Sequence, residues 1–388
     1  MSTRSIQQDF TVRHQYPVHF TRGVFDLENP LLSLELRGPE QPGKVLFVLD
    51  EGVERAFPSV VQDIERYFGA HGIPVVQLLI LPGGEQVKND PSFLVNLYEA
   101  LDVHHIDRHD HVVVLGGGAL TDLVGFAAST SHRGIRLIRL PSTVLGQNDA
   151  AVGVKTSVNL FGKKNWLGTF TPPKAVINDL LFLEGLSQRD WLCGLAEAVK
   201  VALIKDRAFF EWLERHAAQL NQRDLDAMEY AVFRCAELHL EHIGRSGDPF
   251  ERGSSRPLDY GHWAAHKLES ISAHRIRHGE AVAFGVALDA MYAHLTGMLS
   301  ARQLERILHL FRALRLPYLY RECAARDAQG GWALLEGLQE FREHLGGRLT
   351  ISLIPTIGEQ VDVHHVDAAI LEQAYTNLVE TEVLYAHP

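Results

Sequence analysis

The residues best suited to chemistry are one carboxylate and two imidazoles in three segments that lie far apart in the sequence. The segments are Gly194-Leu195-Ala196-Glu197, Gly261-His262 and His278-Gly279-Glu280. Glutamate and histidine bind divalent metals, and three protein ligands leave one coordination position open, as a catalytic zinc requires. The pattern predicts a catalytic metal site with Glu197, His262 and His278 as its ligands.

A glycine turn indicates a second cofactor. Gly116, Gly117 and Gly118 follow the apolar run Val112-Val113-Val114-Leu115 and precede a helical pattern. A strand that leads through glycines into a helix can bind an anion, here most simply a dinucleotide, although a glycine cluster by itself also fits a tight turn. A metal that holds hydroxyls beside a nicotinamide that accepts a hydride would form an alcohol-oxidising site.

Other polar residues could serve these ligands, and each has a structural alternative. Asp50 ends a predicted strand, where a carboxylate commonly holds ribose hydroxyls, but a solvated loop acid fits equally well. A glycine-containing segment suits a phosphate or polyol, or else an exposed loop, and it carries Asp149, Lys155, Asn159, Lys164 and Asn165. Glu197 and Lys200 share a helix face, as do His262 and His266. Such pairs are usually weak ion pairs or unliganded histidines, but their apolar surroundings favour a metal.

The elements that must position these residues change in kind along the chain. Apolar runs predict strands at 44–50, 74–81, 112–115 and 135–140, which alternate with helical patterns at 60–70, 91–101 and 119–129. That alternation is typical of a parallel sheet covered by helices. The period then becomes helical, at 191–204, 207–219, 225–242, 261–270, 280–296, 301–314 and 334–344, with a late strand at 349–354 and a last helix at 368–379. We expect an α/β domain over residues 1–185 and a helical domain over 186–388.

The composition excludes several classes of protein. A chain of 388 residues fits two domains, and 46% hydrophobic with 22% charged residues describes an ordinary globular protein. The net charge of −11, without a dense basic run, argues against nucleic acid and membrane partners. Cys193, Cys235 and Cys323 are odd in number and lack CxxC spacing, and neither a signal segment nor a membrane span is present. These features predict a cytoplasmic protein.

An ordered set of motifs resembles the sugar phosphate cyclases, the superfamily of 3-dehydroquinate synthase. The motifs run from about Asp50 to Thr296 and read GGGALTDLVGFAAS, Arg133-Gly134, LPSTVLGQNDAAVGVKTSVN, GKKN, GLAEAVK, DYGHWAAH and RHGEAVA. The resemblance implies a Rossmann-like N-terminal domain and an all-α, metal-binding C-terminal domain. It also implies a bound NAD, a divalent metal such as zinc or cobalt, a sugar phosphate substrate and a homodimer.

The resemblance also assigns roles by position. The metal ligands fall on Glu197, His262 and His278. The substrate-contacting positions of the family match Asp149, Lys155, Asn165 and Lys200, and His266 matches a histidine near the phosphate. Arg133 matches an arginine that relatives contribute to the phosphate across the dimer. The NAD-contacting positions match Glu85, Lys88, Gly117, Gly118, Asp122, Ser142 and Thr143. Together with Asp50, Gly116 and Lys164 they form the predicted cofactor site.

Departures from the dehydroquinate synthases indicate a different substrate. Those enzymes have arginine and then asparagine before the metal-binding Gly-His, where this chain has Ser255 and Asp259. Their helix lysine is His239 here, and Arg342-Glu343-His344 stands roughly in place of their C-terminal Asp-Lys-Lys. That lysine and arginine grip the carboxylate of the substrate, a role that a serine and a neutral imidazole do not fill.

With Asp259 before the Gly-His, the chain is similar to the cyclases that act on sedoheptulose 7-phosphate. Because it retains His266, it resembles those of the 2-epi-valiolone synthase type or of the Ebo cluster. The expected enzyme is therefore an NAD-dependent carbon–oxygen lyase that takes a hydride, eliminates phosphate, returns the hydride and closes a C7 cyclitol. If Arg252 or Arg256 restored the carboxylate clamp, the chain would be a 3-dehydroquinate synthase. A metal-dependent polyol dehydrogenase and a binding module without catalysis are the alternatives from other classes.

Overall fold

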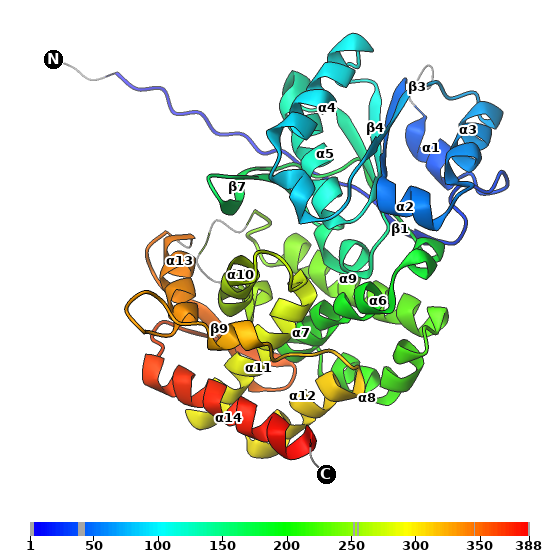
Figure 1. Cartoon of the computed structure of the whole chain (residues 1–388). Coiled ribbons are helices and arrows are strands. Elements are labelled where there is room, and N and C mark those ends of the chain that lie inside the picture. Colours follow the sequence, from blue (N-terminus) through cyan, green and yellow to red (C-terminus); the bar gives the residue numbers. More distant parts are fainter. Residues whose placement is uncertain (1–3, 38–42, 251–252, 254–255, 345, 387–388) are drawn as a thin grey trace.

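The computed structural model of this chain describes residues 4–37, 43–250, 253, 256–344 and 346–386. The earlier part of the chain, blue to green in Figure 1, forms a sheet covered by helices, and the later part, green to red, is mainly helical. The sheet is parallel throughout and has the strand order β1-β8-β5-β4-β2-β3. Its strands are β1 (Val18–Thr21), β2 (Val45–Asp50), β3 (Val75–Leu81), β4 (His111–Gly116), β5 (Arg136–Pro141) and β8 (Ala175–Asp179).

Helices cover both faces of the sheet because its central strands are apolar on both sides. In β2, Val45, Phe47 and Leu49 belong to one core and Leu46 and Val48 to the other. The first core includes residues of α1 (Leu31–Leu36), α2 (Glu51–Ala56) and α3 (Val60–Ala70). The second includes residues of α4 (Pro91–Val103) and α5 (Gly118–Thr130).

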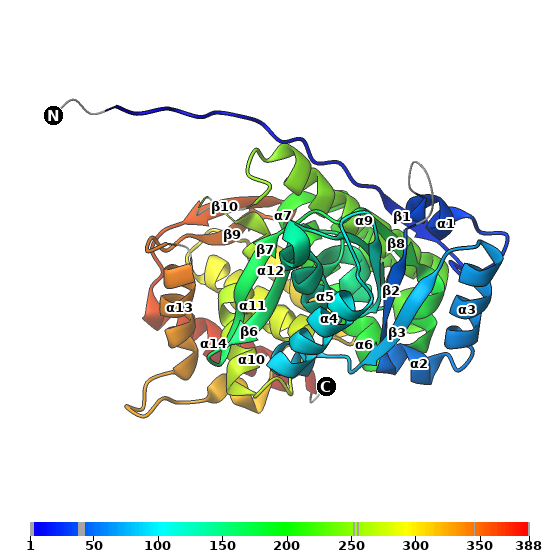
Figure 2. The same cartoon turned by 90° about the horizontal axis from the view of Figure 1, so that it is seen from above.

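An antiparallel hairpin leads from the sheet toward the later helices. It consists of β6 (Lys155–Leu160) and β7 (Lys163–Phe170), and β6 packs along α5. This hairpin is not among the predicted elements, because lysine, asparagine, serine and threonine leave no continuous apolar run in either strand. Its tip approaches α10 in the view from above (Figure 2).

The later part of the chain packs around one central helix, α11, whose residues from Gly279 to Ala293 are all buried. Its neighbours include α7, α10, α12 and α14. The helices are α6 (Gln188–Cys193), α7 (Leu195–Lys205), α8 (Arg207–Asn221), α9 (Leu225–Arg245), α10 (His262–Ile271), α11 (His278–Leu295), α12 (Ala301–Ala313), α13 (Glu336–His344) and α14 (Ala368–Ala386). A small antiparallel sheet joins β9 (Ile351–Thr356) and β10 (Glu359–Val363). Short helices occur at Glu85–Lys88, Ser131–Arg133, Gly146–Ala150, Leu180–Gly185, Pro257–Asp259, Arg321–Ala324 and Ala333–Leu335.

The predicted fold class, a parallel α/β part followed by a helical part, is confirmed. One predicted helix, 191–204, is interrupted at Gly194 and forms α6 and α7. A Cβ atom at Gly194 would lie 2.6 Å from the backbone nitrogen of Leu145, so the close approach of that loop requires glycine there. None of the described helices is both long and apolar enough to cross a membrane.

Candidate active site

Several of the predicted cofactor residues lie at the carboxyl edge of the sheet, at its topological switch point. From β2 the chain proceeds to β3 on one side, whereas from β4 it proceeds to β5 on the other. Asp50 ends β2 and Gly116 ends β4, so the two residues lie on either side of the crevice between these strands. Open α/β sheets bind ligands in this crevice.

The glycines of this crevice permit close packing. A Cβ at Gly116 would lie 3.0 Å from the Cβ of Asp50, and one at Gly83 would lie 2.5 Å from its Oδ2. A Cβ at Gly117 would lie 3.3 Å from Thr143 Cγ2. Asp50 itself caps α2 by accepting a hydrogen bond from Gly52 N, and burial raises the pKa of its carboxyl. Gly118 starts α5, so the helix N-terminus with its unpaired N–H groups borders the crevice.

A buried ammonium group connects four of the predicted residues beside the crevice. Lys88 Nζ lies 2.7 Å from Asp122 Oδ2 and 2.5 Å from Asn165 Oδ1, with Glu85 at 3.8 Å. Ser157 also accepts from Lys88, at 2.9 Å. The fold therefore brings together two residues of the β3–α4 connection, one of α5 and two of the hairpin.

A second cluster lies in the interior of the helical part, around Glu197. Its Oε1 is 2.6 Å from Lys200 Nζ and 2.9 Å from His239 Nε2, and His239 Nδ1 lies 3.5 Å from Asp149. Burial by itself would raise the pKa of Glu197, but Lys200 and His239 lower it below its ordinary value. The pKa of Lys200 is raised by Glu197 and Asp149 in spite of burial. Glu197 and Lys200 are thus both charged, and His239 contacts two carboxylates.

Three imidazoles form a third cluster between α10 and the start of α11. The ring centroid of His262 lies 5.3 Å from that of His266 and 5.4 Å from that of His278. Glu269, buried on α10, accepts from His278 Nδ1 at 3.0 Å and from Lys164 Nζ at 2.8 Å. Since Lys164 belongs to β7, the hairpin is tied directly to the histidine cluster.

The second and third clusters adjoin at His262. Its pKa is lowered well below the ordinary value by burial first and then by Lys200, His266 and His278. Within the described ranges, Glu197 groups with Asp149 and His239, and His278 groups with His266 and Glu269, in each case with ligand atoms within 4.8 Å of one another. Glu197 and His278 therefore lie in neighbouring groups, with His262 interacting with both.

The predicted ligands have the donor types of a divalent-metal site, although neither group of ligand atoms within 4.8 Å in the described residues contains all three. Glu197 Oε2 is buried and, in the described part of the chain, has no hydrogen-bond partner. His278 directs Nδ1 to a carboxylate, and His262 directs Nδ1 to the carbonyl oxygen of Tyr260 at 3.3 Å. Because both acceptors require a protonated Nδ1, a neutral ring keeps its lone pair on Nε2. One orphaned carboxylate oxygen and two Nε2 atoms are the donors that zinc or cobalt would take.

The remaining predicted residues surround these clusters at different distances. Asp259 adds to the larger effect by which Glu197 and Asp149 raise the pKa of Lys200, and Arg256 Nη1 lies 4.0 Å from Asp259 Oδ2. A cavity of about 300 Å³ is lined by Lys164 and His274 among others, beside the histidine cluster.

Arg133 lies away from these clusters and is exposed. It follows the C-terminal end of α5, which at about 1.5 Å per residue lies about 20 Å from the glycines at the start of that helix. Lys155 begins β6, and Ser142 donates its N–H to Gly116 O. Ser255 and Arg252 lie outside the described residues.

Sequence reasoning missed two carboxylates that support the clusters. Glu269 follows His262 and His266 by seven and three residues on α10, so the helical spacing was a usable signal. Asp289 is buried on α11 and accepts from Gly261 N at 3.0 Å and from Trp263 Nε1 at 2.9 Å. No sequence pattern pointed to Asp289, because the pairing depends on how α10 packs against α11.

Comparison with known proteins gives consistent matches over nearly the whole chain. Residues 78–193 match the family model "3-dehydroquinate synthase N-terminal" and residues 194–330 match "3-dehydroquinate synthase C-terminal". The 3-dehydroquinate synthase of Shewanella sp. (strain MR-4) is 33% identical over 372 residues, which cover 96% of this chain and 98% of that protein.

Two solved structures are similar over comparable lengths. ValA, the 2-epi-5-epi-valiolone synthase of Streptomyces hygroscopicus subsp. jinggangensis 5008 with NAD⁺ and Zn²⁺ bound, is 30% identical with a TM-score of 0.87, over 97% of this chain and 100% of that chain. A 2-deoxy-scyllo-inosose synthase shares the fold at 23% identity and a TM-score of 0.77, over 92% of this chain and 95% of that chain.

Proposed function

This chain belongs to the sugar phosphate cyclases of the 3-dehydroquinate synthase family, and we propose that it converts sedoheptulose 7-phosphate, with release of phosphate, into a C7 cyclitol of the 2-epi-valiolone type. The position of His239 carries this proposal. It stands where dehydroquinate synthases have a lysine for the substrate carboxylate, yet it contacts Glu197 and Asp149. An acid substrate would meet two carboxylates there, whereas a polyol finds hydrogen-bond acceptors.

A 3-dehydroquinate synthase is the second candidate, because two curated relatives with that name are 33% and 34% identical to this chain. That activity would need a cation for the carboxylate. Of the two arginines that could supply this cation, Arg252 and Arg256, only Arg256 is among the described residues. Its guanidinium lies 4.0 Å from the carboxylate of Asp259. The arrangement of charges therefore favours a sugar phosphate without a carboxylate.

We propose NAD and a divalent metal, zinc or cobalt, as cofactors. The donor atoms of Glu197, His262 and His278 support the metal, and the crevice around Asp50 and Gly116–Gly118 supports the dinucleotide. The likeness to a valiolone synthase with NAD⁺ and Zn²⁺ bound supports both. When bound, NAD supplies reversible hydride transfer and the metal polarises substrate oxygens.

Residues of this chain then bind and orient the substrate. Lys200 stays charged because Glu197 and Asp149 raise its pKa, so it places a positive charge and hydrogen-bond donors beside the metal ligands. Asp149, Lys155 and Asn165 would hold the polyol. His266, exposed at the edge of the histidine cluster, would meet the phosphate.

Arg133 would act on a second copy of the chain. It lies beyond the far end of α5 from the cofactor crevice, which supports a role across a homodimer rather than in its own site. A homodimer and a cytoplasmic location remain proposals.

The deciding experiment compares kcat/KM for sedoheptulose 7-phosphate and for the acid substrate of dehydroquinate synthase on one preparation. Loss of one partner of a buried ion pair costs about 3–5 kcal/mol, so we expect at least about a hundredfold lower value for the acid. NADH absorbance should not rise while phosphate is released, because the hydride is returned. A preference for the acid would establish a dehydroquinate synthase, and stoichiometric NADH would establish a dehydrogenase.

A further inference from the structure

The N-terminal segment of this protein has the sequence of a β-strand but no strand partner within the described chain. Residues 4–15 are exposed and belong to no helix or strand. Apolar residues occupy only even positions, at Ile6, Phe10 and Val12, and the same alternation continues through Tyr16 into Val18 and Phe20 of β1. Ile6 is 97% exposed and Phe10 is 76% exposed, so the segment, here called the arm, presents a strand-like apolar face to solvent.

The arm begins at a fixed point and leads away from the body of the molecule. Tyr16 donates its hydroxyl hydrogen to Val152 O at 2.8 Å, and the ring of His14 lies edge-on to Phe250 at 6.2 Å. Both overall views show the arm running outward from there (Figures 1 and 2). At about 3.3 Å per residue its 12 residues span about 40 Å, close to twice the radius of gyration of about 21 Å expected for a chain of 388 residues.

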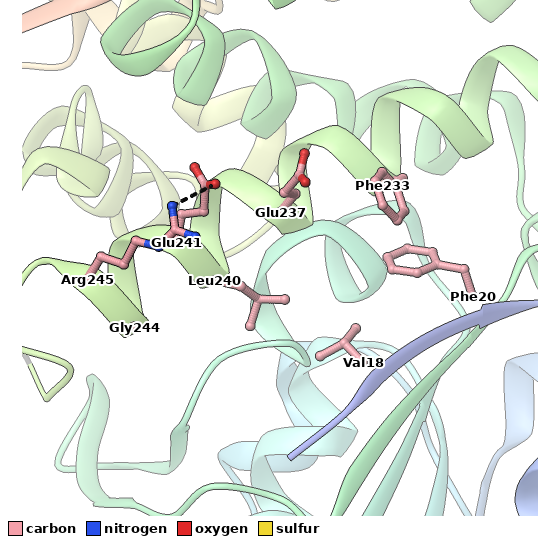
Figure 3. Close-up of a pocket in the computed structure, with 8 residues that line it drawn as sticks. All are labelled: Val18, Phe20, Phe233, Glu237, Leu240, Glu241, Gly244 and Arg245. Carbon is pink, nitrogen blue, oxygen red and sulfur yellow. Dashed lines mark hydrogen bonds and ion pairs between the residues drawn. The ribbon is translucent and has the colours of Figure 1, made fainter. Parts of the chain in front are cut away.

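A groove beside β1 has the complementary character. It measures about 510 Å³, and its floor consists of Val18 and Phe20 from β1 with Phe233 and Leu240 from α9 (Figure 3). Phe233 is 46% exposed although its ring lies 4.9 Å from that of Phe20. β1 is also the edge strand of the six-stranded sheet, bonded only to β8 in the described chain, so its outer backbone groups can pair with another strand.

The arm of one chain cannot readily enter its own groove. It joins β1 directly, so a return would require a chain reversal between Arg13 and Val18. Within that stretch the Tyr16 hydroxyl is held by Val152 O, which fixes the direction in which the chain enters β1. The charges of arm and groove are complementary: the groove lining has two carboxylates and one guanidinium, whereas residues 4–15 have two guanidinium groups and one carboxylate.

We propose that residues 4–15 form an exchange arm, and that in a homodimer the arm of each copy lies in the groove between β1 and α9 of the other copy. A two-fold axis satisfies both contacts at once, because each copy offers one arm and one groove. The inference concerns assembly and is independent of which sugar phosphate the enzyme uses.

A disulfide cross-link tests the contact directly. Protein carrying Val12→Cys is mixed with protein carrying Glu241→Cys and oxidised; the three native cysteines are buried and do not compete. We expect a covalent dimer, and only background cross-linking when Val103→Cys, 67% exposed on α4, replaces the groove variant. A chain carrying both Val12→Cys and Glu241→Cys would form an internal disulfide if the arm occupied its own groove, and that result would overturn the proposal.

Sedimentation gives an independent measurement. The double variant Phe10→Asp/Val12→Asp should raise the dimer dissociation constant at least tenfold, whereas Val103→Asp should leave it within twofold of the unmodified protein. The melting temperature of the isolated monomer should not change, because Phe10 and Val12 are 76% and 61% exposed in their own chain. A monomeric unmodified protein, or an unchanged dissociation constant in the double variant, would refute the exchange arm.

Discussion

Replacement of Glu269 by glutamine tests whether the histidine cluster is a metal site. Glu269 is 4% exposed and accepts from His278 Nδ1 at 3.0 Å and from Lys164 Nζ at 2.8 Å. Although burial would raise its pKa, Lys164 and His278 lower it well below the ordinary value. The side chain is therefore a carboxylate that fixes the ring of His278 and leaves Nε2 for the metal.

The expected loss of metal affinity in Glu269→Gln follows from the interactions that the amide cannot make. Glutamine keeps one acceptor oxygen but turns an NH₂ group toward a second donor, so one of the two charge-assisted contacts is lost. A hydrogen bond to a charged group contributes about 1.5–3 kcal/mol, and loss of such an outer-shell partner typically lowers metal affinity about 10- to 100-fold. The free energy and the change in affinity agree, since about 1.4 kcal/mol corresponds to a tenfold change in a binding constant.

The assay is competition between the metal-free protein and a chromophoric chelator for zinc or cobalt. Glu340→Gln is a matched control, because Glu340 also pairs with a lysine of α10, Lys267 at 2.8 Å, but is 60% exposed. We expect Glu269→Gln to bind metal 10- to 100-fold more weakly and the control to change less than twofold. Equal metal affinity of Glu269→Gln and the unmodified protein would refute the assignment of His278 as a ligand held by Glu269.

Three further predictions concern the same helices. His278→Ala should lose bound metal and activity while its helical circular dichroism is retained, and full occupancy by elemental analysis would remove His278 from the site. Gly285→Ala should lower the free energy of unfolding by about 1–3 kcal/mol or more, because its Cβ would lie 1.9 Å from Gly261 O. Gly69→Ala is the control, because a Cβ at Gly69 would have no neighbour within 4 Å, and it should not lower the free energy of unfolding. Equal effects of the two substitutions in urea unfolding would contradict this prediction. Burial raises the pKa of Asp289 to about 7, so its protonated form favours the fold, and the free energy of unfolding should fall as pH rises from about 4 to 7, by at most about 4 kcal/mol. Asp289→Asn should remove that slope, and an unchanged slope would exclude this carboxyl as its source.

The local order of the chain could be predicted because local interactions produce it. The apolar run of β4, the glycines after it and the helical period of α5 are features of neighbouring residues, and they placed the cofactor crevice before any contact was known. The same periodicity gave most helices of the later part. The domain boundary at residue 185 and the role of each site residue stay predictions.

The sequence alone determined the residue types of the candidate site. These are the glycine turn between strand and helix, the segments of Glu197, His262 and His278, and a histidine, His239, where dehydroquinate synthases have a lysine. Only the tertiary structure decided how they are partnered. His239 meets Glu197 from 42 residues away, and the bond between Glu269 and Lys164 joins α10 to a hairpin 105 residues earlier. Ion pairs and hydrogen bonds act over a few ångströms of space, so their partners are set by how helices and the hairpin pack, which no local pattern records.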